Sequence, residues 1–216
     1  MIEIGNKQNC CGCAVCTQAC PKHCITMVED AEGFLYPDVE LEKCVDCNMC
    51  QRVCPMLNKT DEDAPYTKAY AAYNLDEKER LQSSSGGVFS LLAKQVLREG
   101  GVVYGAAMSE DCTSARHIKA ESPDDLVALR GSKYIQSSTE GVYQQIKNEL
   151  DNRRKVLFSG TPCQIAGLKS LLRTDYENLL CVGVICHGVP SSKIWRKYLR
   201  YRENRAGASA RRTFFR

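Results

Sequence analysis

The sequence predicts an α+β protein in which a small cysteine-rich domain precedes an α/β layered domain. Two observations lead to this prediction. Ten of the 14 cysteines in the 216-residue chain lie within the first 54 residues. From Lys68 onward, short β-prone runs alternate with helical patterns, which is typical of α/β layers.

The composition indicates a cytoplasmic protein whose cysteines are reduced. Hydrophobic residues make up 44% of the chain and charged residues 25%, as in ordinary globular proteins. Residues 1–9 lack the basic start and apolar stretch of a signal peptide, so the oxidising route to disulfides is not indicated. The longest apolar run, residues 179–186, is far shorter than the ~18 residues of a membrane span. We therefore expect metal-binding cysteines and no membrane span.

The positive charge of the chain is confined to its C-terminal segment. Residues 1–60 and 61–190 carry net charges of −3 and −2, whereas residues 191–216 carry nine basic side chains and one acidic one. The body of the chain therefore does not suggest a nucleic-acid-binding protein. Apolar residues such as Trp195 and Leu199 recur at helical spacing in the basic segment. We favour the solvated side of a helix over an interaction surface, and both interpretations stay open.

A cysteine pattern occurs twice in the N-terminal domain. The pattern is C-x2-C-x2-C-x3-C-P, and its second copy lies 34 residues after the first. Its residues are Cys10, Cys13, Cys16, Cys20 and Pro21, then Cys44, Cys47, Cys50, Cys54 and Pro55. Tetrahedral zinc takes two ligands from each of two knuckles, which would leave the third cysteine of each copy unexplained.

We therefore prefer two [4Fe–4S] clusters over zinc. The spacing is the signature of a bacterial-type two-cluster ferredoxin domain, in which the fourth cysteine of each copy binds the other cluster. We expect the first cluster on Cys10, Cys13, Cys16 and Cys54, and the second on Cys44, Cys47, Cys50 and Cys20. Cys11 and Cys24 are out of register, and we expect them to be small buried apolar residues.

The composition changes after the second copy of the pattern. Residues 55–68 are polar, acidic and interrupted by prolines. We therefore place a linker at 61–67, between a ferredoxin-type domain at 1–60 and an α/β domain at 68–216. No closing element is evident at the end of the chain, so we expect the second domain to be incomplete at its C-terminal end.

The local patterns predict the following elements. In the first domain, β-prone runs at 25–28 and 34–39 flank a turn at 30–33. In the second domain we expect strands at 68–73, 102–107, 156–159 and 179–185, and helices at 88–99, 141–150, 161–172 and 192–202. Residues 126–130 are too short a run to assign.

Two loops of the second domain precede predicted helices. Residues 83–87, Ser-Ser-Ser-Gly-Gly, either bind a phosphate or simply cap a helix. Residues 160–164 contain a capping box from Thr161 to Gln164, which places Cys163 in the first helical turn. Free backbone N–H groups there favour a thiolate, so we expect Cys163 to be a nucleophile or a metal ligand.

A third loop, residues 186–191, follows a predicted strand. It begins with Cys186, which lies at the carboxyl edge of the sheet, as Cys163 does. Because α/β sheets bind ligands at that edge, we expect both cysteines to face one crevice and to be catalytic. His187 is a weaker candidate for tuning a cofactor. Cys112 and Cys181 are expected to be structural.

Five motifs occur in a fixed order: the two-cluster pattern, SSSGGVFSLL at 83–92, GSKYIQS at 131–137, GTPCQIAGLK at 160–169 and CHGVPS at 186–191. This order resembles the coenzyme F420 hydrogenase/dehydrogenase beta-subunit family, over nearly the whole chain. The resemblance implies an iron–sulfur flavoprotein that passes electrons between clusters, FAD and an organic substrate such as a deazaflavin. It also implies a second, C-terminal half that this sequence lacks.

The resemblance further implies particular site residues. The FAD pocket would be built on the glycine-rich and Gly-Thr-Pro-Cys-Gln loops, with Ser85, Gly86, Gly87, Lys133, Tyr134, Thr161 and Gln164 as candidates. Cys163 and Cys186 occupy family motif positions that can ligate a further [4Fe–4S] cluster.

We therefore expect an iron–sulfur, flavin-dependent oxidoreductase whose partner is a redox protein or a small-molecule substrate. Two alternatives remain. One is an electron-transfer module without its own substrate site, although such a carrier would need neither Cys163 nor Cys186. The other is a thiol-based enzyme that acts through Cys163.

Overall fold

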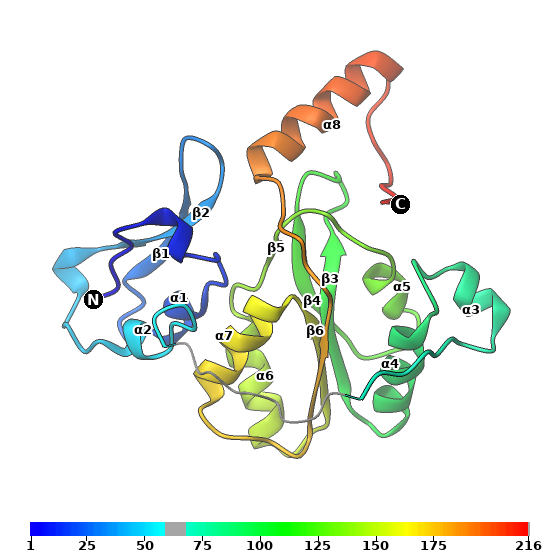
Figure 1. Ribbon diagram of the computed structural model, residues 1–216, viewed down its shortest axis with the longest axis horizontal. Helices are drawn as coiled ribbons and strands as arrows, with labels where there is room; N and C mark the ends of the chain where they lie inside the picture. The colour runs from blue at the N-terminus through cyan, green and yellow to red at the C-terminus, as the bar shows by residue number, and fades with distance from the viewer. Residues whose placement is uncertain (59–67, 216) are drawn as a thin grey trace.

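The computed structural model describes residues 1–58 and 68–215, so the predicted linker at 61–67 lies outside the described residues. They form a two-stranded hairpin near the N-terminus and a five-stranded sheet in the order β5-β4-β3-β6-β7. Figure 1 shows the small N-terminal domain beside the larger sheet, which carries helices on both faces. The α+β fold class predicted from the sequence is confirmed.

The N-terminal domain consists of short elements around a β-hairpin. Its elements are η1 (Lys7–Asn9), α1 (Val15–Ala19), β1 (Ile25–Glu29), β2 (Leu35–Val39), η2 (Leu41–Lys43) and α2 (Met49–Arg52). The strands pair antiparallel, with Ile25 opposite Val39. Asp30 closes the turn, because its Oδ1 accepts hydrogen bonds from the backbone N–H groups of residues 32–34. Gly33 has a φ of 89°, which glycine adopts without strain.

The five-stranded sheet is mixed. Its strands are β3 (Val102–Met108), β4 (Ala115–Ala120), β5 (Ser137–Ser138), β6 (Val156–Gly160) and β7 (Leu179–Gly183). β3, β6 and β7 are parallel, whereas β4 runs antiparallel to β3 and β5 runs parallel to β4. The carboxyl ends of β3, β6 and β7 therefore share one edge of the sheet with the amino ends of β4 and β5.

Helices cover both faces of this sheet. They are α3 (Glu77–Leu81), α4 (Val88–Arg98), α5 (Leu126–Leu129), α6 (Val142–Asp151), α7 (Pro162–Leu172) and α8 (Ser192–Ala206). Val103 and Leu157 face the core under α4 and α5, while Tyr104 and Phe158 face the core under α6 and α7. This alternation follows from the two-residue period of a strand. The result is a three-layer α/β/α arrangement (Figure 1).

Most predicted elements are confirmed, with ends that differ by a few residues. The strand expected at 68–73 is wrong: these residues are exposed and pair with no strand in the described part of the chain. Among the elements of the second domain, β4, β5 and α3 were not predicted, and the unassigned run at 126–130 contains α5. β4 alternates buried and exposed residues over a charged sequence, β5 has two residues, and α3 has five. Such runs are too brief or too polar for periodicity to detect.

The N-terminal domain packs against α6 and α7 and shares their core. Cys13, Val15 and Val53 belong to the same buried cluster as Phe158 and Leu168. In Figure 1, α6 and α7 lie between the N-terminal domain and the sheet. The two domains are therefore joined by a continuous apolar core.

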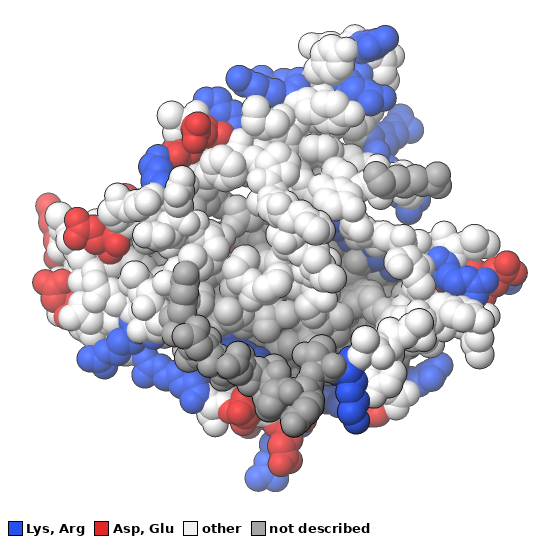
Figure 2. All heavy atoms as spheres, viewed as in Figure 1, with Lys and Arg blue, Asp and Glu red and all other residues white. Residues whose placement is uncertain are grey.

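A second contact joins α8 to the hairpin of the N-terminal domain. The Arg196 guanidinium pairs with the Glu29 carboxylate at 2.6 Å, and Lys193 Nζ donates to the Ala31 carbonyl at 2.7 Å. Figure 2 shows Lys and Arg side chains gathered over α8. No helix among the described residues, α8 included, is long and apolar enough to cross a membrane.

Candidate functional site

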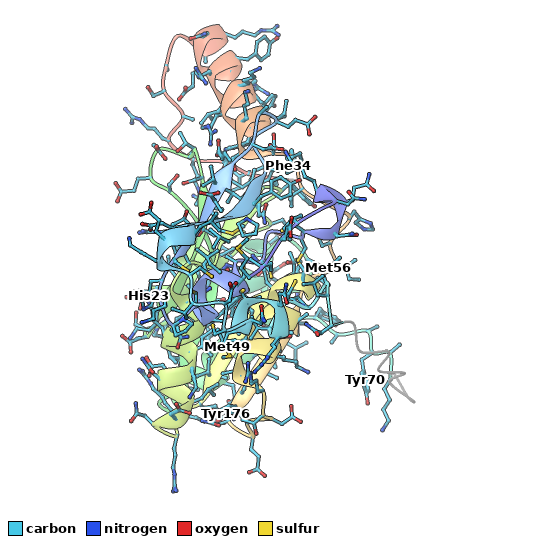
Figure 3. The ribbon with its side chains drawn as sticks, turned by 90° about the vertical axis from the view of Figure 1, so that its left-hand side faces the viewer. His23, Phe34, Met49, Met56, Tyr70 and Tyr176 are labelled. Carbon is cyan, nitrogen blue, oxygen red and sulfur yellow. The ribbon has the colours of Figure 1, made fainter. Side chains whose placement is uncertain are left out.

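The cysteines predicted to bind the second cluster line one cavity. Cys20, Cys44, Cys47 and Cys50 all border it, and Met49, labelled in Figure 3, lines it as well. Four thiols around one cavity are the donor set that a [4Fe–4S] cluster requires. These residues therefore fit the group.

Cys24 is a fifth thiol of this cavity. Its side chain is buried, which confirms the prediction that it is a small buried residue. However, its Sγ lies 3.4 Å from Cys20 Sγ. Cys24 therefore lies among the candidate ligands rather than apart from them.

Three of the four cysteines predicted for the first cluster are neighbours. Burial, together with the nearby Cys10 and Cys54 thiols, raises the pKa of Cys16 to about 12. Burial also raises the pKa of Cys10, an effect that a hydrogen bond from the backbone N–H of Gly12 opposes. In the part of the chain that the structure describes, no three Cys, His, Asp or Glu side chains converge to hold a single metal ion.

The fourth of these cysteines, Cys13, lies against the α/β domain. Its Sγ is 3.4 Å from the position that a Cβ of Gly167, in α7, would occupy. Its carbonyl oxygen accepts hydrogen bonds from Thr139 Oγ1 at 3.0 Å and from Tyr143 Oη at 3.1 Å. Gln136 Nε2 donates hydrogen bonds to the two preceding carbonyl groups, those of Cys11 and Gly12. The loop of the first cluster is thus fixed by side chains of the second domain.

Cys163 starts α7 as predicted. The backbone N–H of Thr161 donates to Gln164 Oε1 at 3.0 Å, so the predicted cap is confirmed. The Cys163 thiol contacts Cys11, and its Sγ lies 3.2 Å from Thr161 Oγ1. The Cys11 contact and burial raise the pKa of Cys163, so the lowering expected at a helix N-terminus is wrong. Cys11 is only half-buried and its thiol lies near those of Cys13 and Cys163, so the prediction that it is a buried apolar residue is wrong.

Cys186 is exposed and follows β7 at the carboxyl edge of the sheet. No hydrogen bond among the described residues joins it to Cys163. Its own Sγ accepts from the backbone N–H of Gly188 at 3.4 Å. The shared crevice and the catalytic role of these two cysteines stay predictions.

The candidate flavin-binding loops gather at one edge of the sheet. Thr161 follows the carboxyl end of β6, and Lys133 and Tyr134 lie in the segment that leads into β5. The glycine-rich loop comes before α4, which runs back along the sheet to the start of β3. Topology therefore brings all three loops to the edge where the parallel strands end, which is where open α/β sheets bind ligands.

Hydrogen bonds join these loops to one another. Ser84 Oγ accepts from the backbone N–H of Ser132 at 2.8 Å, which links the glycine-rich loop to the Lys133 segment. Gln164 Nε2 donates to the Ser137 carbonyl at 2.9 Å, which links the same segment to α7. Residues 131–137 therefore connect the other two loops.

The start of α4 has no side-chain cap. Gly87 is the N-cap residue, with a φ of 73°, so the prediction that a serine caps this helix is wrong. Ser83 Oγ instead donates to the Glu79 carbonyl, and Ser85 is exposed. A Cβ on Gly86 would lie 2.8 Å from the Ala72 carbonyl oxygen, so this glycine allows close chain packing. Uncapped N–H groups at the start of a helix can bind an anion such as a phosphate.

Lys133 and Tyr134 differ in how available they are. Burial lowers the pKa of Lys133 to about 8. Its Nζ donates to the carbonyl groups of Ala128 and Arg130 at the end of α5. The Tyr134 side chain is exposed, and its ring meets Phe215 edge-on. The exposed Tyr134 side chain is therefore available to contact a ligand, whereas the Lys133 ammonium is already hydrogen-bonded to backbone carbonyls.

His117 is a buried residue of this edge that the sequence pattern did not single out. It lies in β4 and stacks on Phe158 with ring centroids 5.2 Å apart. Its Nδ1 lies 2.9 Å from Ser137 Oγ, and its Nε2 lies 2.9 Å from the Ser159 carbonyl oxygen. Because a carbonyl only accepts, Nε2 carries the proton. Burial lowers the pKa of His117, so the ring is neutral, with Ser137 donating to Nδ1.

We expect protonation of His117 to destabilise the fold. Its pKa is below the ordinary value in the folded chain, so the unfolded chain binds the proton first as pH falls. The free energy of unfolding should therefore fall below about pH 6.5, by up to about 1.4 kcal/mol per pH unit. Urea unfolding of the unchanged protein and of His117→Gln, at several pH values above and below about 6.5, measures this change in the free energy of unfolding. The substitution should remove that slope, whereas His187→Gln, at an exposed residue, should keep it; parallel profiles for wild type and His117→Gln would contradict the prediction.

The fold and the site together define an iron–sulfur electron-transfer domain joined to an α/β domain. Residues 9–58 match the 4Fe-4S dicluster domain. Residues 69–143 and 153–209 match the N-terminal and C-terminal regions of the coenzyme F420 hydrogenase/dehydrogenase beta subunit. The chain belongs to this family, as its motif order predicted, and the family is part of an oxidoreductase.

A solved structure has a similar fold. It is a chain of the F420-reducing [NiFe] hydrogenase complex from Methanosarcina barkeri, with a TM-score of 0.50 and 21% identity. The match covers 67% of this chain and 53% of that chain, so this chain spans about half the length of its structural relative. No curated protein matches this chain.

Proposed function

We propose that this chain is an iron–sulfur flavoprotein oxidoreductase that passes electrons between two [4Fe–4S] clusters, FAD and an organic substrate. One observation carries the proposal. The loop of the first cluster is hydrogen-bonded to residues 136–143, which continue from the segment that joins the candidate flavin loops. One-electron and two-electron chemistry would thus meet at one edge of the sheet.

The two cluster sites have different positions in this proposal. The first site packs on α6 and α7 through Cys13, which is buried in their core. The second site is on the outer part of the N-terminal domain, where Cys47 is exposed. We infer that electrons from a redox partner enter at the second site and reach the α/β domain through the first.

The residues of the chain would hold FAD as follows. The uncapped start of α4, with Ser85 and Gly87, would receive the diphosphate, and Tyr134 would offer an exposed ring to the cofactor. Gln164 positions residues 137 and 161 through its two amide hydrogen bonds. A bound flavin supplies the ability to hold two electrons and to exchange a hydride with an organic molecule. Cys163 lies between this edge and the first cluster site, where its thiol contacts Cys11.

The direct test is the cofactor content of the protein after anaerobic reconstitution. Two cubane clusters require about eight iron atoms and eight sulfides per chain, and a further cluster would add about four. We expect that content together with one flavin, seen by its yellow absorbance. Iron without flavin would contradict the oxidoreductase proposal and leave the electron-transfer module. Zinc in place of iron would contradict both.

A further inference from the structure

The loop that carries Cys10 and Cys13 is held by an amide of the other domain. Gln136 Nε2 donates to the Cys11 carbonyl at 3.3 Å and to the Gly12 carbonyl at 3.0 Å. Gln136 is half-buried and lies directly before β5. One side chain of the α/β domain therefore fixes two successive peptide groups of the first cluster site.

The first of these peptide groups, between Cys11 and Gly12, lies between Gln136 and the Cys10 thiol. No peptide bond among the described residues is cis, so the Cys11 carbonyl and the Gly12 N–H point in opposite directions. The backbone N–H of Gly12, at the other end of that peptide, acts on the Cys10 thiol and opposes the rise that burial causes in its pKa. Gln136 therefore contacts the carbonyl end of the peptide whose N–H end acts on the Cys10 thiol.

Gly12 is also shaped for this contact. Its φ is 64°, and a Cβ at this position would collide with Gln136 Nε2. A glycine therefore allows the amide to approach the loop backbone closely. The backbone conformation and the hydrogen bonds independently point to a specific contact.

We propose that Gln136 is a positioning residue that raises the reduction potential of the first cluster through the Cys11–Gly12 peptide. The inference rests on the proposed function, because it requires a cluster on this loop. A hydrogen bond to the carbonyl polarises the peptide and strengthens its N–H as a donor. Hydrogen bonds to cluster sulfurs stabilise the added electron, and they are one of the factors that set the potential. The α/β domain thereby draws electrons from the outer cluster to the inner one.

The test compares the potentials of the two clusters in Gln136→Met and in the unchanged protein. Redox titration followed by electron paramagnetic resonance measures both. We expect one cluster to shift to a lower potential in Gln136→Met and the other to stay unchanged. Gln144→Met is the matched control: Gln144 is exposed and donates to the Gln18 carbonyl across the same interface at 2.8 Å, in α1 and not in the loop that carries Cys10 and Cys13. It should leave both potentials unchanged.

Three results would overturn the inference: an unshifted potential with full iron content, a shift of both clusters together, or an equal shift in Gln144→Met. If Gln136→Met binds its clusters poorly, Gln136→Glu replaces it in the test. This variant keeps the shape of the side chain but replaces the amide donor with an acceptor, and it should lower the same potential. An unchanged potential in Gln136→Glu would overturn the inference as well. Absence of a cluster from the unchanged protein would show in its iron count and would refute the proposed function itself.

Discussion

Replacing Cys47 with serine should halve the iron content of the protein. Cys47 lines the cavity of the second cluster site together with Cys20, Cys44 and Cys50, and it is the exposed member of the set. A serine there creates no cavity and disturbs no core, so the loss follows from the missing thiolate alone. Of about eight iron atoms, about four should remain, all in the first cluster. Iron and sulfide counts with electron paramagnetic resonance of the reduced protein measure this.

Cys181→Ser is the control for this experiment. Cys181 is a half-buried residue of β7 that does not line the cavity of the second cluster site, and its substitution should leave about eight iron atoms. Full iron content in Cys47→Ser would show that Cys47 is not a ligand. Loss of all iron would show that the two cluster sites do not load independently.

A leucine at position 167 should destabilise the joint between the two domains. A Cβ at Gly167 would already lie 3.4 Å from Cys13 Sγ, Tyr143 Oη and Val15 Cβ. The three further carbon atoms of leucine have no room, and overpacking of this kind costs about 1–3 kcal/mol. We expect the free energy of unfolding in urea to fall by that amount. Electron transfer from the reduced clusters to bound flavin should also slow, because the leucine side chain would move the first cluster site away from α7.

Two variants of α7 serve as controls for this prediction. Gly167→Ala places its methyl group at ordinary contact distance, so its stability should change little. Lys169→Leu adds a leucine at an exposed position of the same helix and should leave both quantities unchanged. Equal stability of Gly167→Leu and the unchanged protein would refute the close packing at this position.

Local signals predicted most of the architecture. The cysteine repeat and the hairpin turn at 30–33 are short-range patterns, and the cap at Thr161 involves residues three apart. The helices and buried strands have clear periodicity. By contrast, β4 was missed because its charged side chains hide its alternation, and 68–73 has the composition of a strand without a partner to pair with.

The residues that connect the domains could not be predicted in the same way. The side chains of Gln136, Thr139 and Tyr143 donate to carbonyl groups more than a hundred positions away in sequence. Because every residue has a backbone carbonyl, the residue type does not indicate which carbonyl will accept. The Cys11 and Cys163 thiols lie near each other for the same reason, because the fold brings distant loops together. His117 gave no signal because a single histidine in a strand is ordinary.

The apolar core that joins Cys13, Val15 and Val53 to Phe158 and Leu168 ties metal loading to the stability of the whole molecule. Because ligand binding stabilises whatever folds with the site, assembly of the first cluster adds its free energy to both domains. The α/β domain should then melt in one cooperative transition with the N-terminal domain, and at a higher temperature when iron is present. A chain that fails to acquire its clusters would be less stable throughout and would be cleared by proteolysis sooner.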